Sequence, residues 1–346
     1  MNLPLALFAL AAVIWLTLLL LPWQPWRIRE HFIPDTTDTG RSLANVSVVI
    51  PARDEAAIIA TTLKALQQQD PDLRILLVDD QSSDGTADLA QQYDNGRLTV
   101  LSTPPLPAGW SGKLWALEQG VRQVETDYTL LLDADIELRP GVIAGLLDKL
   151  EQQDRQMISL MARLRMVSQW EKLLMPAFIY FFKLIYPFAL ANRPDSRVAA
   201  AAGGCILIAT ATLRAVGGPA ALRHELIDDC TLARRVKQHG GHMWLGLTQA
   251  AISHRRYDNL GTIWEMVTRT AYTQLHHSLL LLMACMLLLL LSYIVPVAGL
   301  LYPGPARWLA LAALAGMGIS YGPILRYYEL PLWRVLTLPA AALLFG

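Results

Sequence analysis

The stretch that most constrains the fold is an apolar run that ends in acidic residues, Leu130 to Ile136. Its apolar part is typical of a buried strand, and the run closes with Asp133 and Asp135. Strand alternation predicts that these two side chains share one side of the backbone. Open α/β sheets bind ligands at the carboxyl ends of their strands, and carboxylates suit Mg²⁺ or Mn²⁺ held with a substrate diphosphate. For an isolated Asp-x-Asp, a solvated loop is the alternative.

Short apolar runs alternate with amphipathic segments on both sides of this stretch, which is the pattern of a parallel α/β sheet. Strands are expected at 46–50, 74–78, 98–101 and 129–132. Helices are expected between and after them, at 56–69, 86–92, 113–124 and 140–152. The sequence therefore predicts an α/β fold with a nucleotide-binding type of sheet.

Acidic residues also follow the first two expected strands. Pro51 gives a sharp exit from the first strand, and Asp54 and Glu55 follow it. These carboxylates can cap a helix or accept hydrogen bonds from a base or ribose. Asp79 and Asp80 follow the second strand. Two adjacent carboxylates repel one another and need a partner, and a nucleotide is one such partner.

Further downstream, three features are candidates for a functional site. Lys113 follows a glycine at a helix start, where backbone N–H groups and a cation suit a phosphate. Asp228 and Asp229 begin another helix, where acidic side chains either complement the helix dipole or act as a base. Gly203 and Gly204 precede an apolar strand, and such glycines allow a close backbone approach or a bulge.

The composition points to a soluble domain joined to membrane segments. The 346 residues are 53% hydrophobic and 17% charged, which is too apolar for an ordinary soluble enzyme and too charged for a pure membrane bundle. The net charge is zero, so nothing suggests a nucleic-acid partner. The three cysteines, Cys205, Cys230 and Cys285, have the spacing of neither a disulfide framework nor a zinc site, which indicates a reducing compartment.

Three uncharged runs are long enough, or nearly so, to cross a bilayer. They cover 3–21, 278–302 and 308–325. A cleaved signal peptide is the alternative for the first run, but no basic region precedes it and no small-residue cleavage site follows it. Arg27 and Arg29 come shortly after the first run, and the positive-inside tendency therefore puts the following domain in the cytoplasm.

Two shorter apolar segments complete the predicted organisation. Residues 170–192 are interrupted by lysines and prolines, which favours an interfacial helix pair, with a buried core helix as the alternative. Residues 335–346 are too few to span. The predicted domains are an N-terminal transmembrane anchor at 1–26, a cytoplasmic catalytic domain at 42–275, and a C-terminal transmembrane region at 278–346.

These motifs together resemble the family 2 glycosyltransferases, which have the GT-A fold. The resemblance is carried by Val49 to Glu55, Asp79 to Thr86, Gly112 to Gly120 and the Asp133-x-Asp135 pair, in that order. Further on, Asp228 to Arg235 is similar to the family's Glu-Asp-x-x-Leu-x-x-Arg motif, with Asp228 in the place of the glutamate. The implied fold is a Rossmann-like nucleotide-diphospho-sugar transferase domain with added transmembrane helices.

The resemblance also implies roles for individual residues. Asp229 is the expected catalytic base, with Asp228 beside it, and Asp133 and Asp135 are expected to hold the divalent metal. Arg269 could neutralise the leaving diphosphate, although an arginine facing lipid headgroups is the alternative. The residues expected to contact nucleotide or donor are Pro51, Asp54, Glu55, Asp79, Asp80, Lys113, Asp133, Gly203, Gly204 and Arg269.

The expected function is inverting transfer of a sugar, from a UDP-sugar type of donor, to a membrane lipid. Pro-Ala-Gly-Trp-Ser-Gly-Lys113 and the membrane layout are most similar to bacterial hopanoid-associated glycosyltransferases, and more distantly to ceramide glucosyltransferases. We expect a multi-pass protein of the bacterial inner membrane whose partners are the nucleotide sugar, the lipid acceptor and the membrane. The alternatives are a processive polysaccharide synthase, whose Gln-x-x-Arg-Trp motif is absent, and a non-catalytic nucleotide-binding membrane scaffold.

Overall fold

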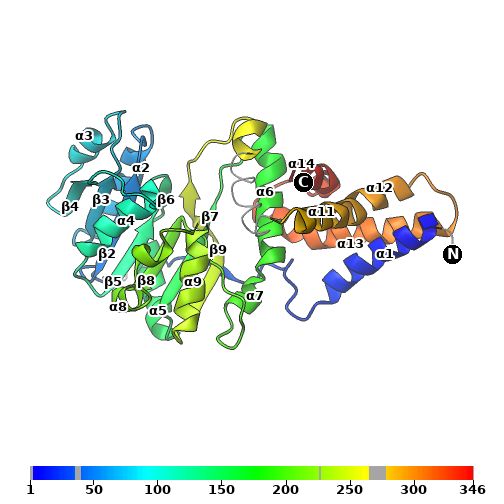
Figure 1. The fold of residues 1–346 in the computed structure, drawn as a ribbon, viewed down its shortest axis with the longest axis horizontal. Helices are drawn as coiled ribbons and strands as arrows, with labels where there is room; N and C mark the ends of the chain where they lie inside the picture. Colours follow the sequence, from blue (N-terminus) through cyan, green and yellow to red (C-terminus); the bar gives the residue numbers. More distant parts are fainter. Residues whose placement is uncertain (1–2, 36–39, 226, 265–277, 346) are drawn as a thin grey trace. The chain divides into compact units, whose positions relative to one another are not determined.

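The computed structural model describes residues 3–35, 40–225, 227–264 and 278–345. These residues form two compact units (Figure 1). The first, which we call the α/β unit, consists of Glu30–Arg165 and Leu190–Arg255. The second, the helical unit, consists of the described parts of Met1–Arg29, Met166–Ala189 and Arg256–Gly346.

The α/β unit is built around one mixed sheet, which has nine strands in the part of the chain described. The strands are β1 (His31–Phe32), β2 (Val46–Ala52), β3 (Arg74–Asp79), β4 (Leu98–Ser102), β5 (Tyr128–Leu132), β6 (Ile136–Leu138), β7 (Met157–Arg163), β8 (Cys205–Ala209) and β9 (Met243–Ser253). Their order is β1-β9-β7-β8-β5-β2-β3-β4, and β6 pairs with β9. The helices are α2 (Ile59–Gln67), α3 (Thr86–Gln91), α4 (Gly112–Arg122), α5 (Val142–Gln152), α8 (Thr210–Ala215), η1 (Pro219–Leu222) and α9 (Asp228–Gln238).

The four expected strands and the four expected helices are confirmed, but the sheet is not wholly parallel. β2 pairs in parallel with β3 and β5, and β3 pairs in parallel with β4. β8 is antiparallel to both β5 and β7. The prediction of a parallel sheet was therefore wrong for β8. An apolar run indicates a strand but does not show the direction of that strand. α2 also starts three residues late, since residues 56–58 form a turn.

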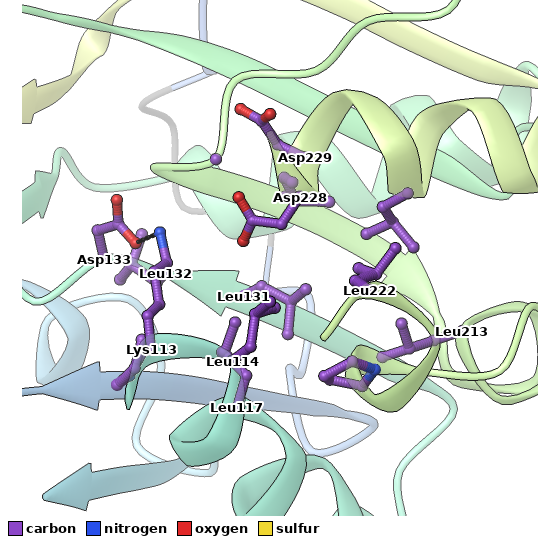
Figure 2. Close-up of a pocket in the computed structure, with 15 residues that line it drawn as sticks. Lys113, Leu114, Leu117, Leu131, Leu132, Asp133, Leu213, Leu222, Asp228 and Asp229 are labelled. Carbon is purple, nitrogen blue, oxygen red and sulfur yellow. Dashed lines mark ion pairs between the residues drawn. The ribbon is translucent and has the colours of Figure 1, made fainter. Parts of the chain in front are cut away.

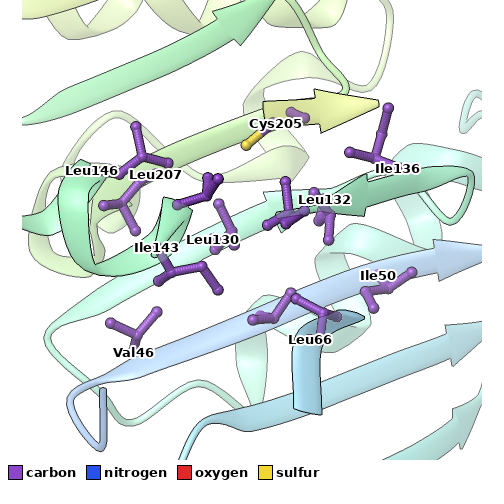
Figure 3. Close-up of a cluster of buried hydrophobic side chains, with 14 of the residues drawn as sticks. Val46, Ile50, Leu66, Leu130, Leu132, Ile136, Ile143, Leu146, Cys205 and Leu207 are labelled. Atoms are coloured by element: carbon purple, nitrogen blue, oxygen red, sulfur yellow. The ribbon is translucent and has the colours of Figure 1, made fainter. Parts of the chain in front are cut away.

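Strand alternation divides the side chains between the two faces of the sheet. On one face, Val46 and Ile50 of β2 and Leu130 and Leu132 of β5 join a buried apolar cluster with side chains of α2 and α5, among them Leu66 (Figure 3). Residues between them point to the other face. The apolar core therefore lies between the sheet and helices α2 and α5. The opposite face of β5 is available for a different role.

On that opposite face α4 packs closely onto β2 and β3. Gly120 of α4 lies against Val49 and Val78, and a Cβ atom at this position would overlap the Val49 side chain. The helix begins with Ser111, whose hydroxyl accepts a hydrogen bond from the backbone N–H of Leu114. Glycine at position 120 therefore sets how near α4 lies to the sheet, and the cap sets where it starts.

The helical unit contains three helical stretches that are long and apolar enough to cross a membrane, among the residues described. They are α1 (Leu3–Leu20), the continuous run Leu279–Gly299 and α13 (Pro305–Tyr327). The middle run consists of α11 (Leu279–Leu289), the π-helical turn η2 (Leu290–Ile294) and α12 (Val295–Gly299). Small residues allow close packing: Gly316 of α13 lies against Trp15 of α1, and Gly299 lies against Phe8.

Within the same unit, α6 (Gln169–Ile185) packs against α13. It begins with a capping box formed by Ser168 and Glu171, and the hydroxyl groups of Tyr180 and Ser320 are 2.8 Å apart. Its interfacial position stays a prediction. The short α7 (Phe188–Ala191) follows α6, and the C-terminal apolar segment forms η3 (Leu332–Thr337) and α14 (Leu338–Phe345).

Candidate active site

A pocket lies at the carboxyl ends of β2 and β5, on the face of the sheet that α4 covers (Figure 2). Leucines of α4, β5 and α9 form much of its wall. The polar or small residues that line it, and that the sequence predicted as site residues, are Pro51, Lys113, Asp133, Gly203, Asp228 and Asp229. Six predicted residues from five separate segments therefore meet in one place.

Lys113 and Asp133 form an ion pair in this pocket. The ammonium Nζ of Lys113, at the start of α4, lies 2.5 Å from Oδ1 of Asp133, directly after β5. Burial alone would lower the pKa of Lys113, but the carboxylates of Asp133, Asp228 and Asp229 together raise it. Lys113 is therefore held as a cation among carboxylates.

Asp229 is a carboxyl group of this pocket whose pKa is raised toward neutral pH. Burial, with the neighbouring carboxylate of Asp228, raises the pKa of Asp229 to about 6, while the N–H of Cys230 and the charge of Lys113 act in the opposite direction. Its Oδ1 accepts a hydrogen bond of 2.7 Å from the N–H of Cys230. Figure 2 shows the carboxylates of Asp228 and Asp229 projecting from the start of α9. A carboxylate with this pKa is a stronger base than one in water.

The two glycines before β8 lie beside acidic residues of the pocket. The carbonyl oxygen of Gly204 accepts a hydrogen bond of 3.0 Å from the N–H of Asp133. A Cβ atom on Gly203 would lie 3.3 Å from Oδ2 of Asp229, which is tighter than an ordinary contact. Gly204 thus helps to position Asp133, and Gly203 leaves space for Asp229.

Asp133 and Asp135 do not follow strand alternation as the sequence suggested. β5 ends at Leu132, and Asp133 to Asp135 form a turn in which the N–H of Ile136 donates to the carbonyl oxygen of Asp133. Asp135 is buried, with 5% of its surface exposed, and its Oδ2 accepts a hydrogen bond of 2.6 Å from the Ser253 hydroxyl. The two carboxylates are therefore held by different partners.

A second charged group lies beside this turn, at the end of β9. One guanidinium nitrogen of Arg255 is 3.0 Å from Oε1 of Glu55, and another is 3.8 Å from Oδ2 of Asp135. Burial raises the pKa of Glu55, and the charge of Arg255 lowers it. The ring of His254 lies 2.6 Å from a carboxylate oxygen of Glu137. The carboxylates of Glu55 and Asp135 are therefore both close to the guanidinium group of Arg255.

Asp79 and Asp80 are both buried at the end of β3. Oδ2 of Asp80 lies 3.3 Å from the guanidinium of Arg53, so the partner that two adjacent carboxylates need is an arginine. The Asp80 carboxylate also occupies the space that a side chain at Gly112 would fill. Oδ1 of Asp79 is buried and has no hydrogen-bond partner among the described residues, so this oxygen can still accept a hydrogen bond.

Asp54 has a structural use in this fold. Its backbone has a positive φ of 54°, and its carboxylate accepts a hydrogen bond of 2.8 Å from the N–H of Ser83. Its own N–H donates to the Ser82 hydroxyl. These bonds hold the loop between β3 and α3. Arg269, the remaining predicted donor-binding residue, lies outside the described residues.

Sequence reasoning did not assign Arg53, Ser253, His254 or Arg255 to the site. All four follow or end a strand at the same edge of the sheet, as the acidic residues do. The signal was therefore present in the run after β9, where polar residues directly follow eleven residues of strand. It was missed because the search began from the acidic residues that follow strands. The pairing of cations with these acidic residues was not considered.

The carboxylates of the site fit a divalent cation in one specific way. No three His, Cys, Asp or Glu side chains of the described residues gather into a complete metal cage. Mg²⁺ is usually held by one or two carboxylates together with substrate phosphates rather than by a cage of protein ligands. Asp133 and Asp135, as hard oxygen donors beside the pocket that contains Lys113, agree with that arrangement.

The mixed α/β sheet, with its pocket at the carboxyl ends of the strands, has the GT-A fold. Residues 47–216 match the model of the family described as Glycosyl transferase family 2. The 4,4'-diaponeurosporenoate glycosyltransferase of Staphylococcus haemolyticus is 32% identical over 113 residues, which are 30% of this chain and 28% of that protein.

Two further relatives come from other organisms. The GalNAc(5)-diNAcBac-PP-undecaprenol beta-1,3-glucosyltransferase of Campylobacter jejuni is 29% identical over 110 residues, 31% of this chain and 35% of that one. The match thus spans only 28% of the Staphylococcus protein and 35% of the Campylobacter protein. The mannosyltransferase PcManGT of Pyrobaculum calidifontis, solved with GDP-Man and Mn²⁺, superposes with a TM-score of 0.58 and 18% identity over 99% of both chains, and it shares the fold.

Proposed function

We propose that this protein transfers a sugar from a nucleotide-diphosphate donor to a lipid acceptor, with inversion at the anomeric carbon. The observation that carries the proposal is the pocket in which Asp229, with a pKa raised to about 6, lies with the Lys113–Asp133 ion pair. A base and a cation in one pocket are what this reaction requires: one group to accept a proton and one to stabilise a leaving anion.

In the proposed reaction Asp229 accepts the proton of the acceptor hydroxyl. The hydroxyl oxygen forms a bond to the anomeric carbon, while the bond from that carbon to the diphosphate breaks and its electron pair leaves on the phosphate oxygen. A single displacement of this kind inverts the configuration. Asp228 raises the pKa of Asp229 through its charge and so makes it a better base. The Lys113 cation stabilises the negative charge that develops on the diphosphate.

Asp133 and Asp135 are the residues that would hold a divalent metal ion, Mg²⁺ or Mn²⁺. When bound there, the ion would neutralise charge on the donor diphosphate. We assign the nucleotide to the neighbouring group at the end of β3, where Asp79 has a buried oxygen without a partner among the described residues and Asp80 pairs with Arg53. A UDP-sugar is the donor that we propose, and the complex of PcManGT with GDP-Man makes GDP-sugars the first comparison.

The proposed acceptor is a membrane lipid, and hopanoids are the class to test first. Three helical stretches of sufficient length and hydropathy support a membrane location, and the Campylobacter relative is named for an undecaprenol-linked sugar. We propose the bacterial inner membrane, with the transmembrane anchor near 1–26, the catalytic domain at 42–275 in the cytoplasm and the C-terminal spans at 278–346.

The test is nucleotide release by the purified, detergent-solubilised protein from UDP- and GDP-sugars, with and without Mn²⁺ or Mg²⁺ and a bacterial lipid extract. We expect release that requires metal and is increased by lipid, and we expect Asp229→Asn to reduce kcat by about 10²- to 10⁴-fold. Asp88→Asn is the matched control, because Asp88 is also in the first turn of a helix but is exposed on α3. Full activity of Asp229→Asn would rule out the proposed base.

A further inference from the structure

The helical unit has an open hollow at the end where α1 and α13 both finish. The chain just after α1 contributes Trp26, Arg27 and Arg29, and the last turns of α13 contribute Arg326 and Tyr327. We call this feature the arginine hollow. It brings three guanidinium groups from two distant parts of the sequence to one place.

Two of the arginines of this hollow, Arg27 and Arg29, contact uncharged side chains. The Arg27 guanidinium lies 5.0 Å from the centre of the Trp26 ring, and Arg29 donates a hydrogen bond of 2.7 Å to the side-chain oxygen of Gln24. Within the described ranges, neither Arg27 nor Arg326 forms an ion pair with a carboxylate. Arg27 and Arg326 therefore both bring positive charge to the hollow, and this charge favours an anion there.

Trp26, which lines the hollow, carries a polar atom that has no hydrogen-bond partner among the described residues. The indole N–H of Trp26 is buried and has no hydrogen-bond acceptor anywhere in the described part of the chain. A buried donor without an acceptor is costly, and a ligand or water usually satisfies it. Guanidinium groups bind phosphate oxygens in pairs of hydrogen bonds, and phosphate oxygens can also accept from an indole N–H.

The position of the hollow along the helices identifies the source of the phosphate. Trp15 of α1 lies against Gly316 of α13. Further along these two segments, residues 26–29 and residues 323–327 line the same hollow. The two helices therefore run in the same direction and end at the same level. Where apolar spans end, tryptophan and tyrosine lie at the depth of the lipid headgroups. A phosphate at this level belongs to a lipid.

We propose that the arginine hollow binds the phosphate group of an anionic membrane lipid. The proposal rests on the membrane location of the helical unit and not on the transfer reaction. It assigns Arg27, Arg29 and Arg326 to headgroup binding, a role separate from the catalytic pocket of the α/β unit. Because the arginines are positively charged, a headgroup with a net negative charge should bind better than a zwitterionic headgroup, whose ammonium group they repel.

The test is a titration of the full-length, detergent-solubilised protein with dioctanoyl phosphatidylglycerol, followed by native mass spectrometry. We expect the Arg27→Gln/Arg326→Gln variant to bind at least about tenfold more weakly than the wild type. Arg307→Gln is the matched control, because Arg307 is exposed near the opposite end of the same helix, about 28 Å away at 1.5 Å per residue. It should bind as the wild type does, and dioctanoyl phosphatidylcholine should bind weakly to all three proteins.

Two further measurements separate the possible explanations. Arg27→Lys/Arg326→Lys keeps the charges but loses the paired hydrogen bonds, so its affinity should fall between those of the wild type and the glutamine variant, which excludes misfolding as the cause. Equal phosphatidylglycerol binding by the wild type and the glutamine variant would overturn the proposal. Displacement of the lipid by millimolar inorganic phosphate would assign the hollow to free phosphate and overturn the lipid assignment. Wild-type lipid binding without sugar transfer would contradict only the proposed function.

Discussion

The raised pKa of Asp229 predicts how kcat/KM depends on pH. Its pKa is raised to about 6 by burial, and only the ionised form can accept a proton. The carboxylate is ionised above that pH and protonated below it, so kcat/KM should be level at pH 7 to 8 and fall about tenfold for each pH unit below the pKa.

The measurement is the initial rate of nucleotide release at saturating metal and at a donor concentration well below KM, between pH 5 and pH 8. The residual activity of Asp229→Asn should show no such fall, because asparagine does not titrate. A wild-type profile that stays level down to pH 5 would mean that Asp229 is not the group that accepts the proton.

Gly203 gives a second prediction at the residue scale. In Gly203→Ala the new Cβ would lie 3.3 Å from Oδ2 of Asp229, so the carboxylate must shift by a few tenths of an ångström. Since small displacements of a catalytic group reduce the rate steeply, kcat should fall about tenfold while the donor KM changes little. Gly322→Ala is the control, because nothing lies within 4 Å of a Cβ at that position.

Individual site residues could be predicted from the sequence where a polar residue stands at the end of a strand or the start of a helix. Asp133 follows an apolar strand, while Lys113, Asp228 and Asp229 stand at helix starts, and all four line one pocket. Their mutual arrangement could not be predicted, because it depends on the turn after Leu132 and on partners that are distant in sequence. Arg255 illustrates this limit: it reaches Glu55 across 200 positions, and no local pattern contains that contact.

At the scale of elements, the close packing of α4 on the sheet predicts a stability effect. In Gly120→Ala the added methyl group would overlap the side chains of Val49 and Val78, so α4 must move away from β2 and β3. Such overpacking costs about 1–3 kcal/mol, and the thermal midpoint of the α/β unit should fall. Arg122→Ala, on the same helix but exposed and paired with Glu118, should change stability by no more than about 0.5 kcal/mol.

The elements themselves could be predicted more fully than their connections. The apolar runs gave the positions of β2 to β5, and the amphipathic segments gave α2 to α5. The direction of β8 could not be predicted, because Ile206 to Ala209 has the same composition in a parallel or an antiparallel strand. Direction is set by the end of the sheet at which the chain returns after β7, and no local pattern contains that information.

At the scale of the whole molecule, the number and direction of the apolar helices predict a topology. Three crossings place the chain after α1 and the end of α13 on one side and the short connection before α13 on the other. Arginines follow α1 and end α13, and the positive-inside tendency makes that side the cytoplasm. The α/β unit should therefore be cytoplasmic, where nucleotide sugars are available, and the N-terminus should be outside.

Labelling with a membrane-impermeant maleimide tests this topology. In a Cys285→Ser background, where the remaining Cys205 and Cys230 are buried, Arg307→Cys should react in intact spheroplasts because residue 307 lies at the outer start of α13. Asp88→Cys, on the α/β unit, should react only after the membrane is opened. Labelling of Asp88→Cys in intact spheroplasts would reverse the topology. It would also remove the donor from the reach of Asp229, because nucleotide sugars are made on the cytoplasmic side, so the labelling result bears directly on the proposed reaction.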